Sequence, residues 1–77
     1  MAAEVKFEIV ERLAVLKEHK LAWDLELNLV SWNGNEPKYD IREWNEDHTR
    51  CGKGITLGLD ELKKLVDYCE EARIWDI

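Results

Sequence analysis

Two segments of alternating side chains, residues 23–33 and 38–44, restrict the fold of this chain more than any other feature. Alternation of apolar and polar residues is typical of a β-strand that is covered on one face. The residues from Asn33 to Pro37 separate the two segments and supply the Asn, Gly and Pro that favour a tight turn. Such a short connection makes the two strands antiparallel neighbours. The sequence therefore predicts a β-hairpin in the middle of the chain.

Two further strands are predicted on either side of this hairpin. Residues 6–17 alternate imperfectly, which predicts a strand that contains a bulge or one that is covered on both faces over its second half. A turn over residues 18–22 would join it to the hairpin. After the hairpin, a polar loop and the segment Gly52-Lys53-Gly54 lead into a short strand at residues 55–57. These elements together predict an antiparallel sheet.

The last part of the chain is predicted to be one amphipathic helix. Gly58 can serve as its N-cap, and Asp60 and Glu61 fall in the first turn, where the helix dipole favours negative charge. Its apolar residues cover about half of the circumference, whereas a helix on one sheet needs a stripe only a little over 100° wide. We expect the surplus to be buried by the same helix of a second copy. The alternative is a small monomer with an exposed apolar helix. The expected dimer interface consists of Leu62, Leu65, Val66, Cys69 and Ala72.

One face of the predicted hairpin combines aromatic rings with cations. Period-two geometry places the side chains of one strand alternately on opposite faces of the sheet. We expect an open face with an exposed indole and a core face on the other side. The open face would present Asn28, Trp32, Lys38, Arg42 and Trp44, and the core face Trp23, Leu25, Leu27 and Leu29. Rings that stack on bases, near cations that neutralise phosphates, are what a single nucleic-acid strand needs. The alternative is that Trp44 packs across the strands and that the cations only keep the surface soluble.

The same residues carry a resemblance to a known family. The run Asp40-Ile41-Arg42-Glu43-Trp44, followed after a loop by Lys53-Gly54-Ile55-Thr56-Leu57 and a helix, resembles the positive cofactor four family of transcriptional coactivators, and its small bacterial branch most of all. The likeness covers nearly the whole chain. It implies an α+β fold in which a curved, four-stranded antiparallel sheet precedes one C-terminal helix. It also implies a homodimer formed through the helices, with a sheet surface that binds single-stranded nucleic acid.

The resemblance further implies roles for individual residues. Arg42 and Lys53 would contact the phosphate backbone, and Trp44 would stack on a base. Trp32 is a second candidate for stacking and Lys38 for a further contact, while Arg50 lies in the adjoining loop. The expected function is non-enzymatic binding of single-stranded DNA, or of RNA, with little sequence preference, in transcription regulation or DNA maintenance and with the transcription machinery as a further partner. The alternative is a module that binds a protein partner through the same sheet face.

Length and charge set limits on this interpretation. The 77 residues, with a formal net charge of −6, predict one domain over residues 1–77, near the lower size limit for independent folding. Net charge governs long-range association rather than what a local surface binds. We therefore expect local, salt-sensitive binding. No signal peptide and no long apolar run is recognised, and two cysteines are too few for a disulfide framework. A reduced, cytoplasmic, nucleoid-associated protein without a membrane segment is the expectation.

Residue types that support catalysis or metal binding are sparse. Ser31 is the only serine and falls within a predicted strand, so a hydroxyl nucleophile is not indicated. Asp47, His48 and Cys51 lie close in sequence, but zinc sites commonly use two closely spaced ligand pairs. Only His19 or Cys69 could complete such a set, from distant segments. We therefore expect no catalytic residues, no metal and no cofactor.

Overall fold

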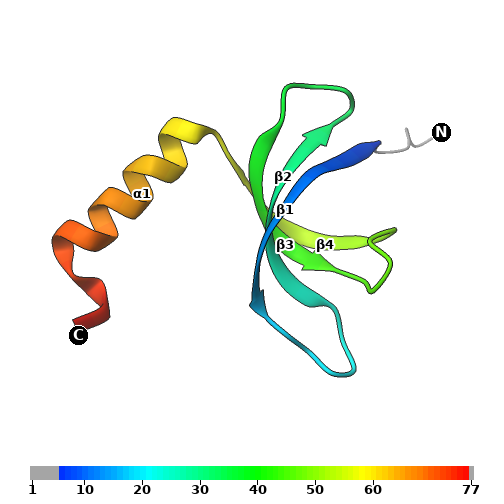
Figure 1. Ribbon diagram of the computed structural model, residues 1–77, viewed down its shortest axis with the longest axis horizontal. Helices are drawn as coiled ribbons and strands as arrows, with labels where there is room; N and C mark the ends of the chain where they lie inside the picture. The colour runs from blue at the N-terminus through cyan, green and yellow to red at the C-terminus, as the bar shows by residue number, and fades with distance from the viewer. Residues whose placement is uncertain (1–5, 77) are drawn as a thin grey trace.

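The structure is a computed structural model that describes residues 6–76, and it contains one antiparallel sheet followed by a helix (Figure 1). The strands lie in the sheet in the order in which they occur in the chain. The elements are β1 (Phe7–Lys17), β2 (Asp24–Trp32), β3 (Lys38–Trp44), β4 (Cys51–Leu57), helix α1 (Leu59–Ala72) and a 3-10 helix η1 (Ile74–Asp76). The predicted architecture of four antiparallel strands and one C-terminal helix is confirmed.

The central hairpin forms as the alternating pattern predicts. Strands β2 and β3 pair without a register shift, from Asp24 opposite Trp44 to Val30 opposite Lys38. Asn33 and Gly34 in the connecting turn have φ values of 53° and 75°, a backbone region that Asn and Gly enter at low cost. The turn residues thus fix the register that brings Asn28 opposite Asp40.

Strand β1 contains the predicted bulges. Its pairing with β2 shifts register between Ile9 and Glu11, between Arg12 and Ala14, and between Val15 and Lys17. The second half of the strand is exposed, with Val15 at 53%, so the alternative of a strand covered on both faces is wrong. Bulges increase the local twist of a strand, and β1 bends across the other strands in Figure 1.

Strand β4 begins at Cys51, earlier than the predicted start at residue 55. The glycines that indicated a loop are part of the strand. A Cβ atom at Gly54 would collide with the carbonyl oxygen of Ile41 and the Cβ of Arg42. Glycine is therefore required where β4 approaches β3 most closely.

The two faces of the sheet differ in chemistry and in burial. We call one the polar-aromatic face; it comprises Phe7, Glu26, Asn28, Val30, Trp32, Lys38, Asp40, Arg42 and Trp44. The other is the aliphatic face, formed by Leu25, Leu27, Leu29, Ile41 and Ile55. All buried residues among residues 6–76 lie on the polar-aromatic face: Glu26, Asn28, Val30, Asp40 and Trp44.

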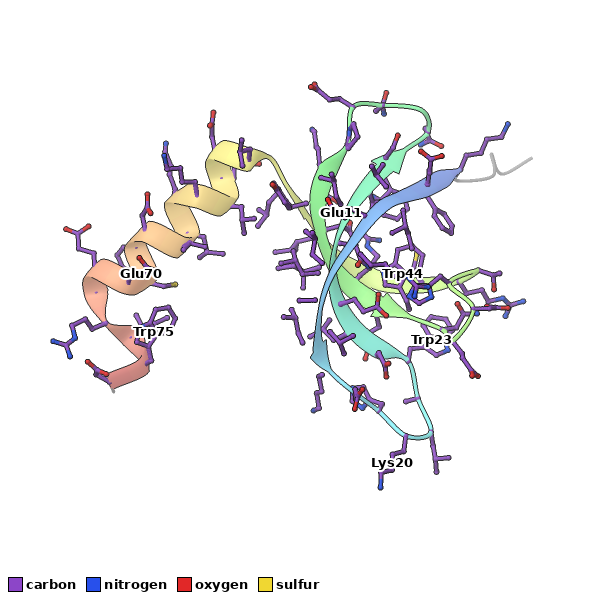
Figure 2. All side chains as sticks on the ribbon, viewed as in Figure 1. Glu11, Lys20, Trp23, Trp44, Glu70 and Trp75 are labelled. Atoms are coloured by element: carbon purple, nitrogen blue, oxygen red, sulfur yellow. The ribbon has the colours of Figure 1, made fainter. Side chains whose placement is uncertain are left out.

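The predicted assignment of core and open faces is therefore wrong. The side chains of Leu25, Leu27 and Leu29 are only half-buried, and Trp23 is 36% exposed just before β2. Alternation shows which residues share a face, but it does not show which face the rest of the chain covers. Here the sheet curves around its polar-aromatic side, and Trp44 lies on the side of the sheet away from α1 (Figure 2).

Helix α1 extends away from the sheet rather than lying on it (Figure 1). Gly58 is its N-cap, as predicted, and the Gly58 N–H donates to the carboxylate of Glu61 at 2.7 Å. Arg73, with φ of 52°, ends the helix in the left-handed conformation. No residue of α1 is buried. The radius of gyration is 14.2 Å, against about 11.5 Å expected for a compact chain of this length, so the single chain leaves apolar surface uncovered.

Candidate nucleic-acid interface

An aromatic cluster forms the centre of the polar-aromatic face. The ring of Trp44 meets the ring of Phe7 edge to face at 5.0 Å and is stacked near Trp32 at 6.4 Å between centroids. Phe7 also lies 5.8 Å from Trp32. The imidazole of His48 stacks on Trp44 at 5.8 Å. Three strands and the β3–β4 hairpin therefore each supply one ring, at distances typical of favourable aromatic pairs.

Trp44 is buried at the bottom of this cluster, with 1% of the residue exposed. The prediction of an exposed indole at Trp44 is wrong. Phe7 comes from β1, and His48 reaches the ring from a hairpin position with φ of 59°. Neither contact could be read from the local sequence pattern of β3. In this conformation Trp44 supports Trp32, and a base could reach the Trp44 ring only if one of its neighbours moved.

Arg42 lies over the half-buried indole of Trp32. Its guanidinium carbon is 4.5 Å from the centroid of the Trp32 ring, within the range of a cation–π contact. Its Nε donates to Oδ1 of Asp40 at 2.6 Å, and Nη1 donates to the carbonyl of Gly52 at 3.3 Å. A longer contact of 3.5 Å joins Nη2 to the hydroxyl of Thr56. Only 15% of the Arg42 side chain is exposed, so its position is well defined.

Asp40 is the fully buried partner of Arg42. Besides the ion pair, the Asp40 carboxylate accepts a hydrogen bond of 2.9 Å from the hydroxyl of Thr56. Burial lowers the pKa of Arg42, but the hydrogen bond and charge of Asp40, with smaller effects from Cys51, outweigh it and raise the pKa. Arg42 therefore stays charged over Trp32. Neither Asp40 nor Thr56 was predicted as a site residue, although their two-residue spacing from Arg42 and Gly54 places them on the same face.

A polar chain lies next to the aromatic cluster. His48 Nδ1 is 2.7 Å from Nη2 of Arg12, and His48 Nε2 is 2.9 Å from a Glu26 carboxylate oxygen. Since arginine can only donate, Nδ1 accepts and Nε2 carries the proton that is shared with Glu26. The Glu26 carboxylate also accepts from the side-chain amide of Asn28 at 2.9 Å. His48, which the sequence placed in a loop, is thus fixed against Trp44 by β1 and β2.

The predicted cations lie at three different places around the face. Lys38 stands exposed at the start of β3, opposite Val30 and therefore on the polar-aromatic face. Arg50 is exposed at the end of the β3–β4 hairpin, and Lys53 is exposed on β4 near the shift in register between β3 and β4. None of these three has an ion-pair partner within 4.0 Å among residues 6–76. Their charges are therefore available to an anionic ligand, unlike that of Arg42.

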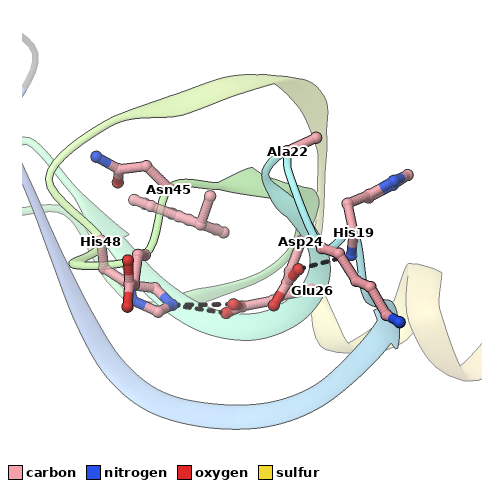
Figure 3. Close-up of a pocket in the computed structure, with 9 residues that line it drawn as sticks. His19, Ala22, Asp24, Glu26, Asn45 and His48 are labelled. Carbon is pink, nitrogen blue, oxygen red and sulfur yellow. Dashed lines mark hydrogen bonds and ion pairs between the residues drawn. The ribbon is translucent and has the colours of Figure 1, made fainter.

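A polar hollow of about 280 Å³ opens beside Trp44, between the β1–β2 connection and the β3–β4 hairpin (Figure 3). Its lining includes the carboxylates of Asp24, Glu26 and Glu46. Figure 3 shows the Glu26–His48 contact and the bond from the His19 backbone N–H to Asp24, which is 2.9 Å long. The hollow also includes Lys20, but its three carboxylates make it acidic, so phosphates are expected to stay out of the hollow itself.

The residues predicted at the helix interface are uncovered in the single chain. Leu65 and Val66 are 47% and 45% exposed, and the other predicted positions are at most half-buried. Cys69 is a free thiol among them. No helix among residues 6–76 has both the length and the apolar character needed to cross a membrane. Within residues 6–76, the apolar stripe of α1 is left largely exposed.

The chain is a small α+β protein with a curved antiparallel sheet and one C-terminal helix. One sheet face carries aromatic rings and an arginine, and exposed cations lie around it. Small α+β proteins with such a face form a class that is suited to binding nucleic acid. Residues 19–68 match the model of the family described as transcriptional coactivator p15 (PC4). The match includes β2, β3, β4 and most of α1 and covers more than half of the chain, so the chain belongs to this family. The resemblance noted in the sequence is confirmed.

A bacterial relative supports the same assignment. An uncharacterized protein of Treponema pallidum (strain Nichols) is 41% identical over 61 residues, which are 79% of this chain and 72% of that protein. The family as a whole binds DNA and has a coactivator role that involves no catalysis. Membership therefore points to nucleic-acid binding and a coactivator-like role for this chain.

Proposed function

We propose that this protein binds single-stranded DNA, or single-stranded RNA, through the polar-aromatic face of a homodimer. Binding is non-enzymatic and shows little sequence preference, and it serves transcription regulation or DNA maintenance. The observation that carries the proposal is the guanidinium of Arg42 over the indole of Trp32, on the same face as the exposed cation Lys38. The proposal extends the DNA-binding role of the family to a particular surface.

Stacking supplies the sequence-independent part of the binding. Every base has a π-face, and each stacked base contributes about 1–3 kcal/mol in single-strand complexes. Trp32 is half-buried, like Phe7 and His48, but it is the ring that carries the Arg42 guanidinium, whereas Trp44 is buried beside it. We therefore assign the stacking role to the Trp32 region, with Trp44 contributing by holding it in place.

Exposed cations supply the salt-dependent part. Lys38 lies at the start of β3, Arg50 at the end of the β3–β4 hairpin and Lys53 on β4, and all three are exposed. About three neutralised phosphates would give a log–log salt slope near −2, with the coefficient for single strands. The net charge of −6 weakens long-range attraction without changing this local count.

A second copy of the chain is the partner that best fits the uncovered apolar surface. Leu65 and Val66 on α1 and Ile55 on the aliphatic face are 47%, 45% and 54% exposed. Self-association in a symmetric dimer would bury both surfaces and leave the polar-aromatic face open, because that face lies on the other side of the sheet (Figure 2). Leu62, Cys69 and Ala72 belong to the same proposed interface.

A fluorescence titration tests the function. The protein is titrated with an oligothymidine of about twenty nucleotides at low and moderate salt, and tryptophan emission is followed. We expect quenching by the single strand that weakens steeply with salt, and little quenching by a duplex of the same length. Binding that does not respond to salt would favour the alternative, in which the same face binds a protein. No binding at low salt would refute the proposed function.

A further inference from the structure

The guanidinium of Arg42 is enclosed on its edge and on one of its flat sides. Asp40, the Gly52 carbonyl and Thr56 lie along its edge at 2.6, 3.3 and 3.5 Å, and the Trp32 ring lies against one side at 4.5 Å. The 15% of the side chain that remains exposed is what a ligand can reach. A ligand that approaches from the side opposite Trp32 would meet the second flat side of the guanidinium.

We propose that Arg42 is a platform on which a nucleobase stacks, and not a contact to the phosphate backbone. Asp40 and Thr56 are the residues that position it. This inference rests on the proposed function, because it assigns a role within the same nucleic-acid surface. It replaces the phosphate contact that the family resemblance implied for Arg42.

The charge distribution supports this role. A phosphate contact is strongest with a cation that has no other anionic partner, since a carboxylate that already binds the cation competes with the phosphate. The carboxylate of Asp40 is 0% exposed and only 2.6 Å from Nε of Arg42, so this pair is neutral as a unit. Lys38, in contrast, is exposed and without an ion-pair partner among the described residues. Phosphate neutralisation therefore falls to Lys38 and the other free cations.

The shape of the pair supports it as well. Bases stack on arginine planes as they do on aromatic rings in single-strand complexes. Trp32 backs the guanidinium of Arg42 from below, and the buried Trp44 lies stacked near Trp32 at 6.4 Å. The face thus carries a layered stack from the buried indole to the guanidinium. A base on top would extend the stack by one more layer and would need no particular identity.

The test compares two strands of equal length, an oligothymidine and a strand of abasic deoxyribose phosphates, with the wild-type protein and the variant Arg42→Lys. Lysine keeps the positive charge beside Asp40 but lacks the plane. We expect Arg42→Lys to weaken binding to the oligothymidine about tenfold and to leave binding to the abasic strand unchanged. A loss below about fivefold on the oligothymidine, or an equal loss on both strands, would overturn the inference.

The salt dependence gives a second measurement that does not need the abasic strand. Lys38→Gln is the matched control, because it removes a free cation from the same face. We expect Lys38→Gln to reduce the salt slope by about 0.7, whereas the double variant Asp40→Asn/Arg42→Gln, which keeps the pair neutral, lowers the affinity and leaves the slope unchanged. A slope that falls equally in both variants would show that Arg42 contacts phosphate. Failure of the wild-type protein to bind either strand would refute the proposed function itself, which is a separate outcome.

The positioning role has its own variant. Thr56→Val keeps the shape of the exposed side chain but removes the hydroxyl that donates to Asp40 at 2.9 Å and faces Nη2 of Arg42. We expect a loss of several-fold on the oligothymidine, with an unchanged salt slope and an unchanged melting temperature to within a few degrees. Unchanged oligothymidine affinity would remove Thr56 from the positioning set.

Discussion

At the scale of single residues, base stacking was predicted for Trp44, but Trp32 is the tryptophan placed to take part in binding and Trp44 supports the fold. Trp44 is 1% exposed and Trp32 is half-buried beneath Arg42. Truncation of Trp44 removes a buried ring and its contacts with Phe7 and His48. We expect Trp44→Ala to destabilise the fold by about 3–5 kcal/mol, measured by urea unfolding. Trp44→Phe is the control and should retain most of that stability. A loss below about 1 kcal/mol for Trp44→Ala would contradict the burial described for this ring.

Trp32 is the residue whose loss should affect binding most directly. We expect Trp32→Ala to weaken oligothymidine binding about ten- to a hundredfold, since it removes the ring that backs the stacking platform. Trp75, exposed on η1, provides the control. Trp75→Ala should leave the affinity for the strand unchanged, provided that the oligomeric state of that variant is also unchanged. Equal effects of the two variants would contradict a specific role for Trp32.

The carboxylate of Asp47 reports on the hairpin that carries His48. Hydrogen bonds from the side chain and backbone N–H of Thr49, at 2.7 and 3.3 Å, lower the pKa of Asp47. Because the pKa of Asp47 is lower in the folded state, its ionised carboxylate contributes to folding stability above the ordinary aspartate pKa. This contribution to stability is lost as pH falls through the folded pKa. We expect Thr49→Val to move the pKa of Asp47 back towards its ordinary value in an NMR titration. An unchanged titration curve would show that Thr49 is not the cause.

At the scale of elements, the spacing of β3 and β4 depends on a single glycine. A Cβ at Gly54 would meet the Ile41 carbonyl oxygen and the Cβ of Arg42, whereas the nearest atom to a Cβ at Gly52 is 3.8 Å away. We expect Gly54→Ala to cost about 1–3 kcal/mol or more through overpacking. Gly52→Ala, the matched control in the same strand, should change stability by less than about 1 kcal/mol. Thermal unfolding of the two variants compares them, and equal stabilities would contradict the close approach.

The elements also show what could be predicted from the sequence. Period-two alternation and the Asn33–Pro37 turn were enough to predict β2 and β3 within a residue at each end, and Gly58 with Glu61 predicted the start of α1. The start of β4 was missed because glycines usually interrupt strands. The buried face was reversed because its cover comes from Phe7, which is remote in sequence from β3, and from His48, which the β3–β4 hairpin brings back onto Trp44. Local pattern cannot predict such contacts, and the Arg42–Asp40–Thr56 arrangement depends on the register between strands in the same way.

At the scale of the whole molecule, the extended single chain predicts self-association. The radius of gyration of 14.2 Å and the uncovered helix α1 leave apolar surface that a dimer would bury. We expect sedimentation equilibrium to give twice the chain mass of 9.1 kDa at micromolar concentration. Leu65→Glu should yield a monomer, because Leu65 lies in the apolar stripe and is 47% exposed. The control Lys64→Glu also adds negative charge to α1 but should remain a dimer. A monomeric wild-type protein would contradict the proposed interface.

The proposed function of the whole molecule depends on which surface meets the nucleic acid, and chemical-shift mapping tests this most directly. The four tryptophans give indole N–H signals that distinguish the polar-aromatic face, with Trp32 and Trp44, from η1, with Trp75. On titration with oligothymidine, we expect the Trp32 indole signal and the backbone amides of Lys38 and Arg42 to shift, while Trp75 and the amides of the aliphatic face remain in place. Shifts confined to α1 and the aliphatic face, or no shifts at all, would contradict the account.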